Sequence, residues 1–361
     1  MSTVPRSVLH VLPHPGGGGE TYFDALERMG GYRFDRRSIT SGPTVRRADR
    51  ILPAAFGISR DARAYDLVHV QGEVGALLCL PALAMRPSLL TPNGLNLLRR
   101  TSGLQERAAR LNLRTIVRAA DRTICVSEAE RDELVEIVGS SLAGRLVVIH
   151  NGVPFGYDVA PDARRDVRAS LGIGESAVVA VCAGDLEPLK DPFTAARAAL
   201  SVAPELDLVM CFAGDGTLRA DLDRLATGEG GRALRVLGRR NDMERVYAAA
   251  DIVVLASIRE GLPFAVLEGM ARGLAPIVSA VPGSMEAVGD AGIVVGCGDV
   301  PGFAAALGRL AADEVERRAR GAAARERVAR MFTASLMIER TRMLYDELTA
   351  ARVDRRPGKV S

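Results

Sequence analysis

The chain has 361 residues, of which 48% are hydrophobic and 25% charged, a composition typical of a globular protein long enough for two domains. Its 47 basic and 44 acidic residues give a formal net charge of +3, which argues against a nucleic-acid-binding protein. No apolar run reaches the ~20 residues of a membrane helix, and the N-terminus lacks the pattern of a signal peptide. The arginine-rich helical stretches are interpreted as solvated faces, with at most a peripheral contact to an anionic membrane surface.

The cysteines are far apart in the sequence and form no CxxC pair. Most of them fall in apolar, strand-like runs such as AVVAVCAG and LVMCFAG. We therefore expect reduced core cysteines and a cytoplasmic protein. The five positions are Cys79, Cys125, Cys182, Cys211 and Cys297.

Short apolar runs alternate with stretches of helical periodicity along the first half of the chain. Strands are predicted at 7–12, 65–71, 88–92, 122–127 and 146–151, and helices at 20–29, 104–120 and 128–138. Residues 41–63 are interpreted as a loop.

The second half of the chain repeats this alternation. Strands are predicted at 176–183, 206–213, 233–238, 251–257, 275–280 and 292–295, and helices at 191–200, 217–226, 243–250 and 264–273. Residues 314–353 are predicted to be helical, with a break near Phe332 and Thr333.

The near-continuous Val, Ile and Leu runs indicate strands buried on both faces, and their alternation with helices predicts parallel sheets. We expect an α/β protein with two Rossmann-like, doubly wound domains at 1–155 and 156–332, and a C-terminal helix at 333–361. The Gly- and Pro-rich segment 151–163 is the expected boundary. Because ligands of such sheets bind beyond the carboxyl ends of the strands, the site is expected in a cleft between the domains.

The segment HPGGGGE, residues 14–20, directly follows the first predicted strand and opens a helix. Consecutive glycines let the backbone approach a ligand closely, and a helix N-terminus offers N–H groups to an anion. The spacing fits neither GxGxxG nor GxxxxGK[ST], so it supports neither a dinucleotide fingerprint nor a P-loop. A flexible turn between strand and helix is the alternative.

The segment REGLPFAVLEGMARG, residues 259–273, follows another predicted strand. Pro263 suits the first helical position, which places Glu268 in the second turn. The loop N–H groups and the helix dipole favour a phosphate, and the carboxylates of Glu260 and Glu268 suit sugar hydroxyls. The alternative is that the acids only complement the helix dipole.

Two further loops also lie between a predicted strand and a helix. Lys190, in CAGDLEPLKDP, precedes a helix start marked by Asp191 and Pro192, where its ammonium group is either solvated or faces a diphosphate. The second loop, AVPGSMEAVG, contains Gly283 and is a weak signal by itself.

Together these motifs resemble glycosyltransferase family 4, also described as glycosyl transferases group 1, which comprises retaining, nucleotide-sugar-dependent enzymes with the GT-B fold. The resemblance runs along nearly the whole chain, and its most specific element is the E-x7-E pair Glu260 and Glu268. The matching stretches are GGGGE, ADRTICVSEAERDELV, VVIHNGV, FAGDG and LGRRNDMERVYAAADIVVLASIREGLPFAVLEGMARGLAPIVS.

The resemblance implies that Glu260 contacts the hydroxyls of the donor sugar, Glu268 the nucleotide ribose and Lys190 the diphosphate. It implies catalytic roles for Glu260, Asn93 and Lys190. The implied donor-binding residues are Gly16, Gly17, Gly18, Asp185, Lys190, Gly238, Arg239, Glu260, Gly261, Leu262, Pro263, Phe264 and Glu268. The implied acceptor-binding residues are His14, Gly19, Glu20 and Asn93.

Two positions depart from the family pattern. Asp185 stands where an arginine is common, and Asn93 where a histidine is common. Since asparagine cannot take up a proton at neutral pH, we expect an acceptor that is unusually nucleophilic or brings its own basic group, such as a thiol, an amine or an aminocyclitol hydroxyl of secondary metabolism. Of the histidines, His10, His69 and His150 are interpreted as packed groups, and His14 as the one candidate to replace the missing histidine.

The expected partners are a nucleotide-sugar donor with UDP or GDP and a small-molecule acceptor whose choice is set by helices of the first domain and residues 41–63. The resemblance implies no metal and no other cofactor. A homodimer remains a possible oligomeric state. Three other functions also remain open: a non-catalytic nucleotide-sugar-binding subunit, an epimerase and a phosphorylase.

Overall fold

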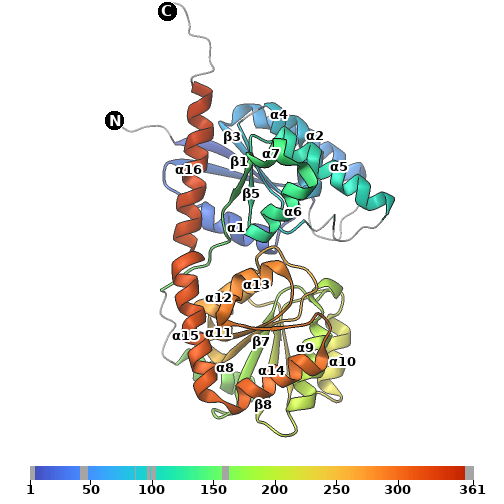
Figure 1. The fold of residues 1–361 in the computed structure, drawn as a ribbon, viewed down its shortest axis with the longest axis vertical. Helices are drawn as coiled ribbons and strands as arrows, with labels where there is room; N and C mark the ends of the chain where they lie inside the picture. The colour runs from blue at the N-terminus through green and yellow to red at the C-terminus, as the bar shows by residue number, and fades with distance from the viewer. Residues whose placement is uncertain are drawn as a thin grey trace, which may run out of the picture. The chain divides into compact units, whose positions relative to one another are not determined.

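The computed structural model describes residues 5–40, 48–85, 87–95, 98, 103–156 and 162–353. The chain divides into two compact units, Met1–Asn151 with Ala334–Ser361, and Gly152–Thr333. Each unit contains one six-stranded sheet with parallel neighbouring strands, accompanied by helices. The predicted fold class, two doubly wound α/β domains, is confirmed (Figure 1).

The sheet of unit 1 has the strand order β2-β1-β3-β4-β5-β6. Its strands are β1 (Arg6–Leu12), β2 (Tyr32–Ser38), β3 (Leu67–Gln71), β4 (Ser88–Thr91), β5 (Arg122–Cys125) and β6 (Leu146–Val148). Its helices are α1 (Gly18–Leu26), α2 (Ala48–Asp61), α3 (Glu73–Leu78), α4 (Leu80–Met85), α5 (Leu104–Ala119), α6 (Glu128–Val138), α7 (Ser140–Ala143) and α16 (Ala334–Val353), with a 3-10 turn at Ala62–Ala64.

Strand β2 was missed by the sequence analysis because it lies at the edge of the sheet. Its sequence, YRFDRRS, carries three arginines, and none of its residues is fully buried. A central parallel strand such as β3, in contrast, is buried at every position and therefore reads as a continuous apolar run. Edge strands need no second apolar face and commonly carry charge, which conceals them in the sequence.

The interpretation of residues 41–63 as a loop is wrong for the residues that the structure describes, since α2 covers Ala48–Asp61. Residues 41–47 lie outside the described residues. Pro53 lies inside the helix, where a proline removes one backbone hydrogen bond and hides the helical signal. Ala55 and Ile58 are buried by one face of α2, which compensates for that loss.

Helix α16 packs against α1 and β3 of unit 1 (Figure 1). Tyr345 is fully buried there, and its hydroxyl lies 2.8 Å from Nδ1 of His69 in β3. Asp346 accepts hydrogen bonds from Arg6 and from Tyr32, both at 2.7 Å. Helix α16 therefore covers the part of unit 1 that is formed by β1, β3 and α1.

The sheet of unit 2 has the strand order β12-β11-β10-β7-β8-β9. Its strands are β7 (Val178–Ala183), β8 (Leu208–Ala213), β9 (Leu234–Gly238), β10 (Ile252–Leu255), β11 (Ala275–Ser279) and β12 (Ile293–Val295). Its helices are α8 (Ala163–Ser170), α9 (Pro192–Val202), α10 (Arg219–Thr227), α11 (Met243–Ala249), α12 (Phe264–Ala271), α13 (Pro282–Val288), α14 (Val300–Ala312) and α15 (Glu314–Met331), with 3-10 turns at Pro188–Lys190 and Gly289–Ala291.

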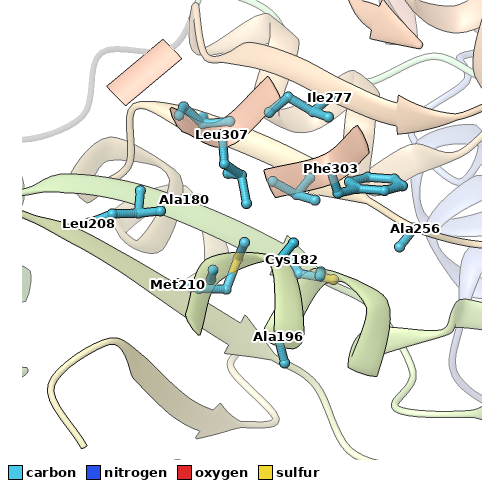
Figure 2. Packing of buried hydrophobic residues seen from close by; sticks show 14 of the residues in the cluster. Ala180, Cys182, Ala196, Leu208, Met210, Ala256, Ile277, Phe303 and Leu307 are labelled. Atoms are coloured by element: carbon cyan, nitrogen blue, oxygen red, sulfur yellow. The ribbon is translucent and has the colours of Figure 1, made fainter. Parts of the chain in front are cut away.

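The core of unit 2 lies between its sheet and helices α9 and α14. Phe303 and Leu307 of α14 belong to the same buried cluster as strand residues that include Ile277 and Ala180 (Figure 2), and all four are fully buried. Burial of a phenylalanine or leucine side chain contributes roughly 1.5–3 kcal/mol. This packing fixes the strands whose carboxyl ends carry the predicted site loops.

The helical stretch predicted at 314–353 forms two helices, α15 and α16, which are separated at Phe332 and Thr333 as expected. Among the described residues, no helix meets the length and apolarity that a membrane span requires. Four of the cysteines are buried, as expected, and Cys297 is exposed; none of the five forms a disulfide.

Candidate functional site

In unit 2, the predicted residues follow different strands but gather at one edge of the sheet. Lys190 lies in the loop after β7, and Glu260 lies in the loop after β10, which pairs with β7. The strand order reverses between these two strands. Strands β8 and β9 follow next to β7 in one direction across the sheet, and β11 and β12 follow next to β10 in the opposite direction. This reversal of strand order is where doubly wound sheets bind their ligands.

Lys190 and Glu260 form an ion pair, with 2.7 Å between Nζ and Oε1. One third of the Lys190 side chain is exposed, whereas the Glu260 side chain is 9% exposed. Burial disfavours the ammonium form, but the negative charges of Glu260 and Asp185 outweigh burial and raise the pKa of Lys190. The loops are also joined through their backbones, since the N–H of Ile258 donates to the carbonyl of Leu189 at 3.0 Å.

Asp185 is exposed, two residues beyond the end of β7. Its charge is one of those that raise the pKa of Lys190. Lys190 therefore faces two carboxylates, and this cation alone does not make the loop positive.

The start of α12 differs slightly from expectation. Pro263 was predicted at the first helical position, but its ψ of 113° is extended and the helix begins at Phe264. Without a backbone N–H, proline lies just before the first turn at no loss of hydrogen bonding. Gly261 and Leu262 precede it in the loop, and Leu262 is buried at 3% exposure.

Glu268 lies in the second turn of α12, as expected. Its Oε2 accepts a hydrogen bond of 2.9 Å from the hydroxyl of Tyr247 in α11. Burial raises the pKa of Glu268 more strongly than the Tyr247 bond and the charge of Arg272 lower it. The structure brings Glu268 together with Tyr247, a residue that the sequence analysis did not select.

Glycines allow the loops at this edge to touch one another. A Cβ added to Gly283, at the start of α13, would overlap the carbonyl of Gly261. A Cβ added to Gly214, after β8, would likewise overlap the carbonyl of Gly184. Gly283, a weak signal in the sequence, therefore has a defined packing role beside Gly261.

Gly238 and Arg239 lie at the same edge, but β9 is two strands away from β7. Gly238 has a φ of +69°, and a Cβ there would lie 2.7 Å from Nη1 of Arg219. Its carbonyl accepts from the N–H of Gly214 at 2.9 Å, which ties the end of β9 to the end of β8. Arg239 is exposed beyond it.

In unit 1, the glycine segment divides between a turn and a helix. Gly16 and Gly17 have φ values of +90° and +72°, and Gly18 and Gly19 form the first turn of α1. Glu20 accepts the N–H of Gly16 at 2.8 Å and Nη1 of Arg36 at 2.6 Å. Both carboxylate oxygens of Glu20 are thus engaged within unit 1.

Asn93 lies two residues after β4 and has a φ of +61°, a conformation that asparagine adopts more readily than most residues. Its Nδ2 donates to Oε1 of Gln71 at 2.9 Å. The following N–H, of Gly94, donates to Oε1 of Glu130 at 2.5 Å, and Oε2 of Glu130 accepts from Val126 at 2.7 Å.

Gln71 and Glu130 were missed by the sequence analysis. A signal existed for Glu130, because Ser127-x-x-Glu130 has the spacing of a capping box, and the Ser127 hydroxyl caps α6. Gln71 gave none, since it is the last residue of a buried strand and reads as part of the core.

Two of the three histidines that were interpreted as packed groups are buried in the structure. His10 and His69 are fully buried, and burial lowers the pKa of His10 to about 3. His150 is partly buried. His14 is also partly buried, with its Nδ1 2.9 Å from the carbonyl of Pro15. Among the described residues, no cluster of three or more His, Cys, Asp or Glu side chains could hold a metal ion.

The chain matches two family models, described as Glycosyltransferase Family 4 over residues 9–156 and Glycosyl transferases group 1 over residues 177–313. It is 30% identical over 284 residues to D-inositol 3-phosphate glycosyltransferase 1 of Catenulispora acidiphila, covering 71% of this chain and 67% of that protein. It is 33% identical over 203 residues to D-inositol 3-phosphate glycosyltransferase of Mycolicibacterium gilvum, covering 54% of this chain and 45% of that protein. The chain spans about half the length of the first curated relatives that it matches.

Among solved structures, Anabaena HepE in complex with UDP-glucose superposes with a TM-score of 0.81 at 19% identity, covering 96% of this chain and all of that one. This likeness shows a shared fold, which is the GT-B fold. Both predicted domains match the predicted family, and the full-chain motifs agree with it. The chain therefore belongs to glycosyltransferase family 4, the glycosyl transferases group 1.

Proposed function

We propose that the protein is a retaining glycosyltransferase that moves a sugar from a nucleoside diphosphate sugar, with UDP favoured over GDP, to a small-molecule acceptor. The observation that carries this proposal is the Lys190–Glu260 pair at the point where the strand order of unit 2 reverses. The UDP-glucose in Anabaena HepE, which has the same fold, supports a uridine donor.

Unit 2 is proposed to bind the donor. Lys190 has three ammonium protons, and the bond to Glu260 uses one of them, so the others remain to neutralise a β-phosphate. The first turn of α12 and the backbone of Gly261 and Leu262 add partial positive charge beside it. Glu260 then accepts hydrogen bonds from hydroxyls of the sugar, and Glu268 accepts hydrogen bonds from hydroxyls of the ribose.

The proposed reaction replaces one bond at the anomeric carbon of the sugar. The bond from that carbon to the β-phosphate oxygen breaks with its electron pair on the nucleoside diphosphate. The acceptor atom forms its bond on the same face, and its proton passes to the departing phosphate oxygen. Lys190 stabilises the charge that develops on this leaving group, which is electrostatic catalysis.

Unit 1 is proposed to bind the acceptor through the glycine segment and Asn93. Since the amide of Asn93 cannot take up a proton at neutral pH, an acceptor that is a strong nucleophile or brings its own basic group fits best. A thiol, an amine or an aminocyclitol hydroxyl of secondary metabolism meets this requirement. Five cysteines without disulfides favour the reducing cytoplasm as the place of this reaction.

Nucleotide binding tests the proposal. UDP should raise the melting temperature of the protein more than GDP or ADP at the same concentration, because a ligand of the native state stabilises it. Lys190→Met should abolish most of this shift. Glu314→Gln, which breaks an exposed ion pair with Arg318 on α15, is the control and should keep it.

Two results would overturn parts of the proposal. A protein that none of the three nucleotides stabilises is not a nucleotide-sugar enzyme. A protein that UDP stabilises, but that transfers glucose from UDP-glucose neither to water nor to D-inositol 3-phosphate, a thiol, an amine or an aminocyclitol, favours the non-catalytic subunit instead.

A further inference from the structure

A buried polar chain in unit 1 links the glycine segment, Asn93 and the core of the sheet. Gln71 is fully buried at the carboxyl end of β3. Its Nε2 lies 2.8 Å from Nε2 of His10, and its Oε1 accepts from Nδ2 of Asn93 at 2.9 Å. None of the motifs quoted from the sequence includes Gln71.

Gln71 also lies directly beneath the glycine segment. A Cβ added to Gly19 would be 2.9 Å from Oε1 of Gln71, so the first turn of α1 rests on this amide because residue 19 has no side chain. The two separate pieces of the proposed acceptor site, Gly19 and Asn93, therefore share one contact. That contact is the Oε1 atom of Gln71.

The orientation of the Gln71 amide gives the direction of the hydrogen bonds in this chain. An amide NH2 group only donates, so Nε2 of His10 accepts the bond from Gln71 and the imidazole is neutral. With its NH2 group directed to His10, Gln71 directs its carbonyl to Asn93 and must accept there. Asn93 consequently uses its NH2 group toward Gln71, and its Oδ1 is the end turned away from that bond.

The surroundings hold each member of the chain in place. The ring of His10 packs against Phe23 and His69, with centroids at 4.9 and 4.5 Å. The backbone after Asn93 is held by Glu130, through the N–H of Gly94. Side chain and backbone of Asn93 are thus fixed by two different residues.

We infer that Gln71 is a positioning residue of the acceptor site, which orients the amide of Asn93 and supports the glycine segment at Gly19. This inference rests on the proposed function, in which Asn93 and the glycine segment face the acceptor.

The test is a double-variant cycle measured with UDP-glucose and whichever of D-inositol 3-phosphate, a thiol, an amine or an aminocyclitol the wild-type protein glucosylates fastest. Gln71→Leu should lower kcat at least about tenfold and leave KM for UDP-glucose within about twofold, because the amide of Asn93 loses its partner. The double variant Gln71→Leu with Asn93→Ala should be no slower than Asn93→Ala alone, since one residue acts through the other.

Two further variants separate positioning from folding. Gln71→Glu keeps an oxygen for Asn93 but removes the donor to His10, and it should recover part of the lost kcat. Thr123→Val alters an equally buried residue of the same sheet, in β5, and should keep the wild-type kcat and KM.

The possible outcomes distinguish a failure of the positioning role from a failure of the proposed function. If wild-type protein transfers glucose but the effects of Gln71→Leu and Asn93→Ala on kcat multiply, the positioning role is overturned and the proposed function stands. If Gln71→Leu keeps the wild-type kcat, the role is also overturned. If wild-type protein transfers glucose to none of these acceptors, the proposed function fails, and the inference fails with it.

Discussion

Each unit has its candidate residues at the carboxyl edge of its own parallel sheet, but the two units hold these residues by different interactions. In unit 2, an ion pair joins Lys190 to Glu260, and Gly283 brings a helix start against the carbonyl of Gly261. In unit 1, a neutral chain runs from His10 through Gln71 to Asn93, and a Cβ on Gly17 would meet nothing within 4 Å. The first arrangement centres on an ion pair between closely packed loops, whereas the second centres on neutral side chains and leaves space at Gly17.

This difference matches the two tasks proposed for the units. A donor diphosphate has the same charge in every reaction of its kind, so a packed loop with a fixed cation serves it well. An acceptor varies in shape, and a turn with space around it tolerates that variation. The following predictions test this division, beginning with the largest expected effect.

Gly283→Ala should lower the free energy of unfolding by about 3 kcal/mol and weaken UDP binding, because its Cβ would overlap the carbonyl of Gly261. Denaturant titration of the variant checks the stability, and a thermal shift with UDP checks the binding. Gly174→Ala, where the nearest heavy atom is 3.9 Å from the new Cβ, is the matched control in the same unit. Equal losses in both variants would show that the close packing at Gly261 has no special importance.

Asp185→Arg should tighten UDP binding about tenfold, equivalent to ~1.4 kcal/mol. The substitution removes one of the two carboxylates whose charges raise the pKa of Lys190 and adds a cation near the proposed diphosphate. Calorimetric titration with UDP at low and high salt measures the effect, and the gain should shrink as salt screens the new charge. Unchanged affinity at low salt would place the diphosphate away from this loop.

Glu268→Gln should stabilise the free protein by about 0.5–1 kcal/mol at neutral pH while weakening UDP binding, as substitutions at functional sites often do. Burial is the main cause of the raised pKa of Glu268, so the folded state holds this proton to higher pH than the unfolded chain does. The free energy of unfolding therefore falls as pH rises from ~4.3, the unfolded pKa, through the raised folded value.

Denaturant titrations of wild-type and Glu268→Gln protein between pH 4 and 8 check this sign. The stability difference should favour the variant at neutral pH and vanish toward the acid end, where the wild-type carboxyl is protonated. A variant that is less stable at neutral pH would show that the ionised Glu268 is held favourably by Tyr247 and Arg272.

The sequence predicted most of unit 2 because its features follow strong local rules. Buried parallel strands such as β7 and β8 read as apolar runs, and Asp191 with Pro192 marks the start of α9. Unit 1 was harder to predict, because β2 is a charged edge strand and α2 contains a proline. Local patterns carry little information about either.

The same contrast applies to the candidate residues. The positions of Glu260 and Lys190 beyond neighbouring strands follow from the order of elements, and their meeting follows from the parallel pairing of β10 with β7. The bond between Gln71 and Asn93 depends on the pairing of β3 with β4, on the left-handed backbone of Asn93 and on a buried side chain. None of these three is written in the local sequence.

The central claim, that the Lys190–Glu260 pair forms the donor site of a glycosyltransferase, is tested most directly by Glu260→Gln. The measurement is the rate of UDP release from UDP-glucose in the presence of the best acceptor, for wild-type protein and the variant. Equal melting temperatures of the two proteins first show that the variant is folded. The account predicts a loss of about 100-fold or more, because the carboxylate contacts the sugar that is transferred. A variant that releases UDP within fivefold of the wild-type rate would contradict it.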